Sequence, residues 1–125
     1  MRVLLDAQAL LWWLDDPSLL SEQARAAVRD GRNEVLVSAV TVWEIVIKQA
    51  LGKLDVPGDL EGAIASSRFA TLPVTMQHAL LVRELPAVHR DPFDRMLVAQ
   101  AMAERAEIVT RDALIGKYPV RCIPA

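Results

Sequence analysis

Short apolar runs alternate with helical stretches along almost the whole chain, and this alternation restricts the possible folds more than any other feature. Runs with the length and apolar character of buried strands occupy residues 2–5, 34–37, 71–74, 107–109 and 120–123. Helical patterns separate them, at residues 7–14, 22–29, from 38 or 41 to 50, 59–68, 75–84 and 92–105. Strands that alternate with helices form parallel sheets covered on both faces. We therefore predict an α/β protein, a three-layer α/β/α fold with a central parallel sheet of four to five strands.

Length and composition indicate a single domain outside the membrane. We expect residues 1–125 to form one domain, and a hydrophobic content of 53% excludes a disordered protein. No apolar run approaches the roughly 18 residues that a membrane span needs, and no secretory signal is apparent, so we expect a cytoplasmic protein. The single cysteine, Cys122, cannot form an intramolecular disulfide. The net charge of -2 argues against a free-standing nucleic-acid binder but not against a nuclease with an acidic site.

Four carboxylates lie far apart in the chain, each beside or within an apolar stretch: Asp6, Glu44, Asp94 and Asp112. An ionised carboxylate in apolar surroundings is costly unless another group compensates its charge. Asp6 and Asp112 directly follow predicted strands, whereas Glu44 and Asp94 fall in the first two turns of predicted helices. Ligands of open parallel sheets bind beyond the carboxyl ends of the strands. We therefore predict that the four acids meet at that edge and share a divalent cation.

An acidic cluster of this kind suits the hydrolysis of phosphodiester bonds. Mg²⁺ and Mn²⁺ prefer oxygen ligands, and Mg²⁺ retains several waters, so a few carboxylates are enough to hold it. Such a cation both stabilises charge on the reacting phosphate and activates a water molecule. Without the cation, the four carboxylates should repel one another, and at least one should take up a proton.

Several neighbouring residues have both a structural and a functional interpretation. Asp91 is more readily explained as the N-cap of the helix that begins at residue 92, although it stands three residues before Asp94. Asp112 has the alternative role of capping a turn at residues 113–116. Lys48 stands four residues after Glu44, a spacing that allows a surface ion pair, a neutralising role in the cluster or a contact to phosphate. For Arg95, a phosphate contact and a solvated surface position are both open.

The histidines and tryptophans have no evident role in catalysis. His78 lies in a predicted helix and His89 in a loop, and neither has the spacing of a metal site or of a nucleophile pair, so we assign them no chemistry. Trp12, Trp13 and Trp43 are better explained as core and interface residues than as stacking platforms for bases. Because Trp12 and Trp13 are adjacent in a helix, they cannot both face one core, and one of them suggests a partner surface.

Four segments together resemble a known family: VLLDAQALLWWL, SAVTVWEIVIKQALGKL, HRDPFDRMLVAQAM and IVTRDALIGKY. In this order and spacing they are similar to those of PIN-domain ribonucleases, and closely to the VapC-type toxins of bacterial toxin–antitoxin pairs. The likeness covers nearly the whole chain. It implies a PIN-like sheet between helices and endonucleolytic cleavage of RNA that depends on Mg²⁺ or Mn²⁺.

The resemblance also implies roles and partners. Asp6, Glu44, Asp94 and Asp112 would form the acidic site, with Asp6 and Asp94 as the most direct metal ligands. Thr110 would position a metal-bound water or Asp112. The partners would be an RNA substrate, a cognate antitoxin and a second copy in a homodimer. We expect the antitoxin to bind a groove made by the helix that carries Glu44 and by the apolar side chains of the first helix, Leu10, Leu11, Trp12 and Leu14.

One departure from the family pattern supports a second hypothesis. After the first aspartate the family usually has a polar pair, often Thr followed by His or Asn, whereas this chain has Ala7 and Gln8. The alternative is therefore a catalytically weakened PIN fold that binds RNA or protein. A receiver-like signalling domain fits poorly, because the first strand ends in the lone Asp6 and the third leads to Thr75. No phosphate-binding glycine loop or serine-hydrolase elbow is present.

Overall fold

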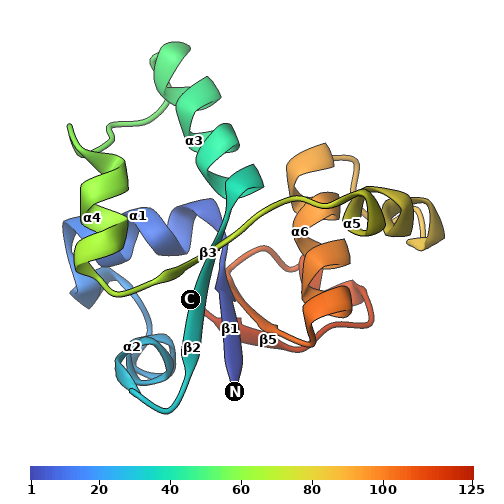
Figure 1. Cartoon of the computed structure of the whole chain (residues 1–125), viewed down its shortest axis with the longest axis horizontal. Helices are drawn as coiled ribbons and strands as arrows, with labels where there is room; N and C mark the ends of the chain where they lie inside the picture. Colours follow the sequence, from blue (N-terminus) through green and yellow to red (C-terminus); the bar gives the residue numbers. More distant parts are fainter.

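The computed structural model describes all 125 residues and contains one sheet in which every neighbouring pair of strands is parallel (Figure 1). The strands are β1 (Arg2–Leu5), β2 (Glu34–Ser38), β3 (Ala70–Leu72), β4 (Glu107–Thr110) and β5 (Cys122–Pro124). Their order across the sheet is β3-β2-β1-β4-β5, so β1 lies in the centre. The predicted parallel sheet is confirmed, and all five strands end at the same edge.

Six α-helices connect or follow these strands: α1 (Ala7–Asp15), α2 (Glu22–Arg29), α3 (Ala39–Ala50), α4 (Leu60–Ser66), α5 (Met76–Leu81) and α6 (Pro92–Glu104). Short 3₁₀ helices occupy Pro17–Leu19, Val82–Glu84 and Ile115–Lys117. The predicted helix at residues 59–68 ends early, and Arg68 just beyond it has a left-handed φ of 61°. The predicted helix at residues 75–84 divides into α5 and a 3₁₀ turn. None of the helices is both long and apolar enough to span a bilayer.

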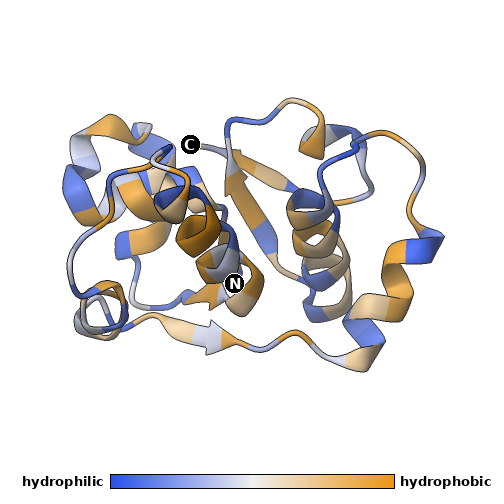
Figure 2. Cartoon of the chain, turned by 90° about the horizontal axis from the view of Figure 1, so that it is seen from above, coloured by the Kyte–Doolittle hydropathy of each residue, from blue (hydrophilic) through white to orange (hydrophobic).

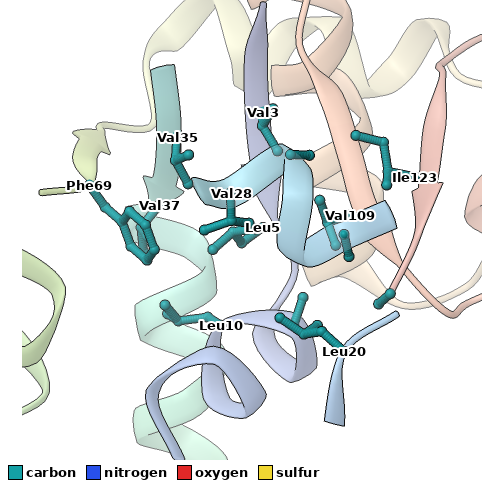
Figure 3. Close-up of a cluster of buried hydrophobic side chains, with 14 of the residues drawn as sticks. Val3, Leu5, Leu10, Leu20, Val28, Val35, Val37, Phe69, Val109 and Ile123 are labelled. Atoms are coloured by element: carbon teal, nitrogen blue, oxygen red, sulfur yellow. The ribbon is translucent and has the colours of Figure 1, made fainter. Parts of the chain in front are cut away.

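The hydrophobic core has two parts, one on each face of the sheet. Side chains of a strand point alternately to opposite faces. Val3 and Leu5 accordingly join a cluster with α1, α2 and α4, which Figure 3 shows, whereas Leu4 joins a second cluster with α6. Figure 1 places α1, α2 and α4 on one side of the sheet and α5 and α6 on the other. The hydropathy colours of Figure 2 show apolar strands between these helical layers, which confirms the three-layer fold.

A capping side chain begins each of the six α-helices, and three of these caps bear on the carboxyl-terminal edge of the sheet. Asp6 follows β1 directly and caps α1, since its Oδ1 accepts a hydrogen bond from Ala9 N at 2.8 Å. Ser38 ends β2 and caps α3 through Val40 N at 3.1 Å. Asp91 caps α6, with a proline at the first helical position. Because β1 and β2 are parallel, α1 and α3 both begin at the carboxyl-terminal edge of the sheet.

Candidate active site

The four predicted acids line one pocket of about 230 Å³. Asp6 comes from the end of β1, Glu44 from α3, Asp94 from the first turn of α6 and Asp112 from the loop that follows β4. Gln8, Lys48 and Arg111 are the other polar residues in its wall. The structure therefore brings together acidic side chains from four separate segments at the carboxyl-terminal edge of the sheet, as the sequence predicted.

Asp6 is held by its own helix and by β4. Burial raises the pKa of Asp6, the hydroxyl of Thr110 and the N–H of Ala9 lower it through hydrogen bonds, and the charges of Glu44 and Asp112 raise it further. Thr110 is buried, and its Oγ1 also accepts a hydrogen bond from the N–H of Asp112 at 3.0 Å. A hydroxyl from β4 thus supports the first aspartate of this chain, in which residue 7 is alanine.

Asp94 is the acid that most resists ionisation. Burial raises its pKa to about 7, and the negative charges of Asp91 and Glu44 add to this effect, whereas His89 opposes it. A carboxyl group with this pKa is substantially protonated at neutral pH. Asp94 is therefore the acid that we expect to take up a proton when no cation is bound.

His89, for which the sequence indicated no role, contacts two of the four acids. Its Nε2 hydrogen-bonds Oδ2 of Asp112 at 2.8 Å and lies 3.0 Å from Oδ2 of Asp94. Burial lowers the pKa of His89, but the hydrogen bond to Asp112 and the charge of Asp94 raise it more. In turn, burial raises the pKa of Asp112, but the hydrogen bond with His89 and the N–H of Leu114 lower it overall. The feature of the sequence that could have placed His89 at the site is its position in the loop that leads to the helix carrying Asp94.

Glu44 and Lys48 form the ion pair that their spacing allows, and this pair lies in the pocket wall. Lys48 Nζ donates to Oε2 of Glu44, whose side chain is only 10% exposed. The hydrogen bond with Glu44 raises the pKa of Lys48, and the charges of Asp91 and Asp94 act in the same direction. The surface-pair interpretation is therefore wrong for Glu44, because the carboxylate is buried among the other acids.

The remaining polar candidates, Asp91 and Arg95, form hydrogen bonds with main-chain atoms of the protein. Oδ1 of Asp91 accepts the N–H groups of Phe93 and Asp94, so Asp91 is the N-cap that the sequence favoured. Arg95 is half-buried, and its guanidinium donates to main-chain carbonyls, Val82 O and Pro86 O among them. Arg95 therefore fastens the loop before α6.

The predicted groove on the first helix is present in part: Leu11, Trp12 and Leu14 line a pocket of about 630 Å³, but neither Leu10 nor any residue of α3 lines it. Leu10 and Leu11 are buried in the core, and Trp12 and Trp13 are only half-buried. A second, more apolar pocket of about 680 Å³ opens between α3, α4 and β3. Trp43 on α3 is 61% exposed and meets Phe93 edge to face at 5.2 Å, so it is not a core residue.

The donor set of the acidic pocket fits a hard divalent cation. All four acids offer carboxylate oxygens, which are the ligands that such cations prefer. Mutual repulsion contributes to the raised pKa of both Asp6 and Asp94, and a bound cation would remove that repulsion. Ligand atoms of His89, Asp94 and Asp112 all lie within 4.8 Å of one another.

The family of this chain follows from its sequence as a whole. Residues 3–120 match the model of the PIN domain family. The chain belongs to the PIN domain family. It is also similar to ribonuclease VapC16 of Mycobacterium tuberculosis, with 39% identity over 59 residues. That match covers 46% of this chain and 42% of the relative, so it spans less than half the length of the curated protein.

Solved structures of other proteins share the fold of this chain. A chain of VapBC2 from Rickettsia felis, solved with a DNA fragment from their promoter, has a TM-score of 0.71 at 13% identity, with 98% of both chains covered. A chain of FitAcB from Neisseria gonorrhoeae has a TM-score of 0.69 at 21% identity, with 98% of this chain and 96% of that one covered. At these identities, the likeness establishes the fold.

Proposed function

We propose that this PIN domain is a metal-dependent endoribonuclease that acts as the toxin of a toxin–antitoxin pair and cleaves RNA phosphodiester bonds. The observation that carries the proposal is the pocket shared by Asp6, Glu44, Asp94 and Asp112. Membership in the PIN family and the similarity to a ribonuclease of the VapC type support the reaction class. The toxin–antitoxin complexes among the structural neighbours support the biological role.

Each acid has a proposed task. Asp6 and Asp94 hold the cation most directly, whereas Glu44 and Asp112 complete the negative field around it. The cation, Mg²⁺ or Mn²⁺, supplies charge stabilisation at the phosphate and an activated water. A bound cation would favour the carboxylate form of Asp94, because a nearby positive charge lowers the pKa of a carboxyl group. The hydroxyl of Thr110 positions Asp6 and Asp112 relative to each other, because it hydrogen-bonds the Asp6 carboxylate and accepts the N–H of Asp112.

Lys48 supplies positive charge next to the acids. It is the basic residue of the pocket wall whose side chain pairs with a site carboxylate. The guanidinium of Arg111, the other basic residue there, donates to the main-chain oxygens of Leu19 and Ala125 and lies over the ring of Trp12 at 4.2 Å. We therefore assign the contact to RNA phosphate to Lys48 rather than to Arg111 or Arg95.

The antitoxin is the proposed regulatory partner, and the apolar pocket between α3 and α4 is its proposed site. Val42, Val46 and Ile64 line that pocket, which adjoins the helix carrying Glu44. An apolar segment bound there would lie close to the acidic pocket. A homodimer remains our expectation, and Met76 and Leu80, which are exposed on α5, are the residues to mutate in testing it.

The alternative is a weakened PIN fold that binds RNA or protein without cleaving it. The Ala7–Gln8 pair motivates it, since the family usually has a hydroxyl after the first aspartate. The Thr110 hydroxyl beside Asp6 favours the nuclease instead.

A cleavage assay separates the two functions. Purified protein is incubated with structured RNA in Mn²⁺ or in EDTA, alongside Asp94→Asn and the exposed-loop control Asp55→Asn. We expect the wild type and Asp55→Asn to cleave only with Mn²⁺ and Asp94→Asn to lose at least about 100-fold in rate, as expected when a group that stabilises the transition state is lost. Equal cleavage by all three proteins would remove Asp94 from the mechanism. Tight RNA binding without cleavage would favour the weakened fold.

A further inference from the structure

We propose that His89 is a positioning residue of the acidic pocket that sets Asp94 and Asp112 around one nitrogen atom and does not ligate the cation. The proposal rests on the proposed nuclease function for its cation, but the contacts that carry it belong to the protein alone. Asp94 starts α6 and Asp112 follows β4, so these two acids come from separate segments. His89 is the one side chain that contacts both.

The first step is the contact geometry of Nε2. This nitrogen hydrogen-bonds Oδ2 of Asp112 at 2.8 Å and stands 3.0 Å from Oδ2 of Asp94. The other oxygen of Asp112, Oδ1, accepts the N–H of Leu114 at 2.9 Å, so the whole carboxylate is oriented. Oδ1 of Asp94 has no hydrogen-bond donor in the protein, which leaves that oxygen for the cation.

The second step is the far side of the ring. The main-chain N–H of Asp91 donates to Nδ1 of His89 at 3.1 Å. A nitrogen that accepts a hydrogen bond presents its lone pair, so the proton of the neutral ring is on Nε2. The main-chain N–H of His89 donates to the hydroxyl of Tyr118 at 2.7 Å, which fixes the backbone of the loop as well.

The third step excludes a ligand role. A histidine nitrogen binds a metal through its lone pair, but Nε2 carries the proton and faces Asp112. Transfer of that proton to Nδ1 would place it against the N–H of Asp91, so two donors would face each other. A hard cation also prefers oxygen ligands. His89 therefore acts through the carboxylates, as histidine and carboxylate partners outside a metal's own ligands do in other sites.

The chain provides its own comparison for this ring. His78 is the only other histidine, and it is buried in the core. Its Nδ1 accepts the N–H of Thr75 at 3.1 Å, and its Nε2 lies 3.1 Å from Oε2 of Glu104. The two histidines thus have the same pattern of an N–H at Nδ1 and a carboxylate at Nε2, but only His89 lies at the acidic pocket.

The proton position is measured by NMR of the full-length protein labelled with ¹⁵N in histidine. Two imidazole rings give a simple spectrum, and Mg²⁺ is diamagnetic. We expect both rings to carry the proton on Nε2 in EDTA, and we expect His89 to keep it there when Mg²⁺ is added to saturation. A proton on Nδ1 of His89 in EDTA, or its loss from Nε2 on adding Mg²⁺, would overturn the proposal.

Calorimetric titration with Mn²⁺ gives the second readout. His89→Ala should bind Mn²⁺ about 10- to 100-fold more weakly than the wild type, the usual effect of losing such a partner. His89→Gln, whose amide nitrogen keeps a donor near the position of Nε2, should recover most of this loss. Arg90→Ala, an exposed neighbour in the same loop, is the matched control and should not weaken binding.

The outcomes separate this proposal from the proposed function. Wild-type affinity in a folded His89→Ala variant, with folding checked by its melting curve in EDTA, would refute the positioning role. Equal losses in His89→Ala and His89→Gln would also refute it, because the donor would then be irrelevant. If the wild type bound no Mn²⁺, the nuclease function would fail, while the NMR spectrum in EDTA would still decide where the proton of His89 lies.

Discussion

The carboxyl group of Asp94 should destabilise the metal-free protein at alkaline pH. Its pKa is about 7 in the folded protein, against an ordinary value of 3.8, because burial and the charges of Asp91 and Glu44 disfavour ionisation. Between these two values, the folded state binds more protons than the unfolded state. The free energy of unfolding therefore falls as pH rises from about 4 to about 7. Substitution by the neutral Asn should relieve this penalty.

The size of the effect follows from the shift. The pKa of Asp94 rises by about 3, and each pKa unit corresponds to about 1.4 kcal/mol, so the ionised carboxylate should destabilise the folded protein by roughly 4 kcal/mol above pH 8. The neighbouring acids share protons with Asp94, and its charge interacts favourably with the N-terminus of α6, so we expect a gain of about 2–4 kcal/mol. At about 3 °C per kcal/mol for a domain of this size, Asp94→Asn should melt roughly 6–12 °C higher.

The assay is urea and thermal unfolding in EDTA at pH 4.5 and pH 8.5, with Asp55→Asn as a control from an exposed loop. The gain of Asp94→Asn should be large at pH 8.5 and fall to about 1 kcal/mol at pH 4.5, where the unfolded chain is itself partly protonated. Mn²⁺ should stabilise the wild type far more than the variant. A variant no more stable than the wild type at pH 8.5 would show that burial and repulsion do not act on Asp94 as described.

Three further predictions test other parts of the structure. Hydrogen bonds from His78 and Arg2 lower the pKa of Glu104. The stabilising contribution of the Glu104 carboxylate is therefore present above pH 4.5 and is lost as pH falls through the lowered folded-state pKa. In urea unfolding, Glu104→Gln should be about 1 kcal/mol less stable than the wild type at pH 7 and equal to it near pH 3. Leu10→Ala should cost about 2–5 kcal/mol in unfolding free energy because Leu10 is fully buried, whereas a small loss would show that Leu10 is not part of the core. Thr110→Val removes the hydroxyl that accepts a hydrogen bond from the N–H of Asp112. Calorimetry should find weaker Mn²⁺ binding, and unfolding experiments should find a loss of about 1–3 kcal/mol in stability. Unchanged Mn²⁺ affinity would contradict the role given to Thr110.

The interior of the sheet was predictable because strand and helix periods are local properties. A short apolar run such as residues 2–5 predicts a strand from a few positions alone, and an acid directly after such a run lies at the strand's carboxyl end. Parallel pairing then brings Asp6 and Asp112 to one edge, whatever the order of the strands. The edges of elements were less predictable, as in β3, where Pro73 cannot donate to a ladder and the strand ends at Leu72.

The residues whose roles the sequence did not settle depend on contacts made only in the folded chain. His89 was assigned no role because its neighbours in sequence offer no partner for Nε2, which meets Asp112 at a separation of 23 residues. Arg95 was left open because the carbonyls that engage it come from the preceding helix and loop. Leu10 was placed in a groove because an apolar helix face has the same sequence pattern whether it packs against a sheet or against a partner.

The amino-acid sequence by itself determined the alternation of strands and helices and the edge of the sheet at which the acids gather. Each of these depends on residue type and short-range spacing, which a chain carries before it folds. Only the tertiary structure decided that His89 stands between Asp94 and Asp112, that burial raises the pKa of Asp94 and that an apolar pocket opens beside α3. Burial and side-chain distance are properties of the packed chain, because they depend on which segments the fold sets against one another.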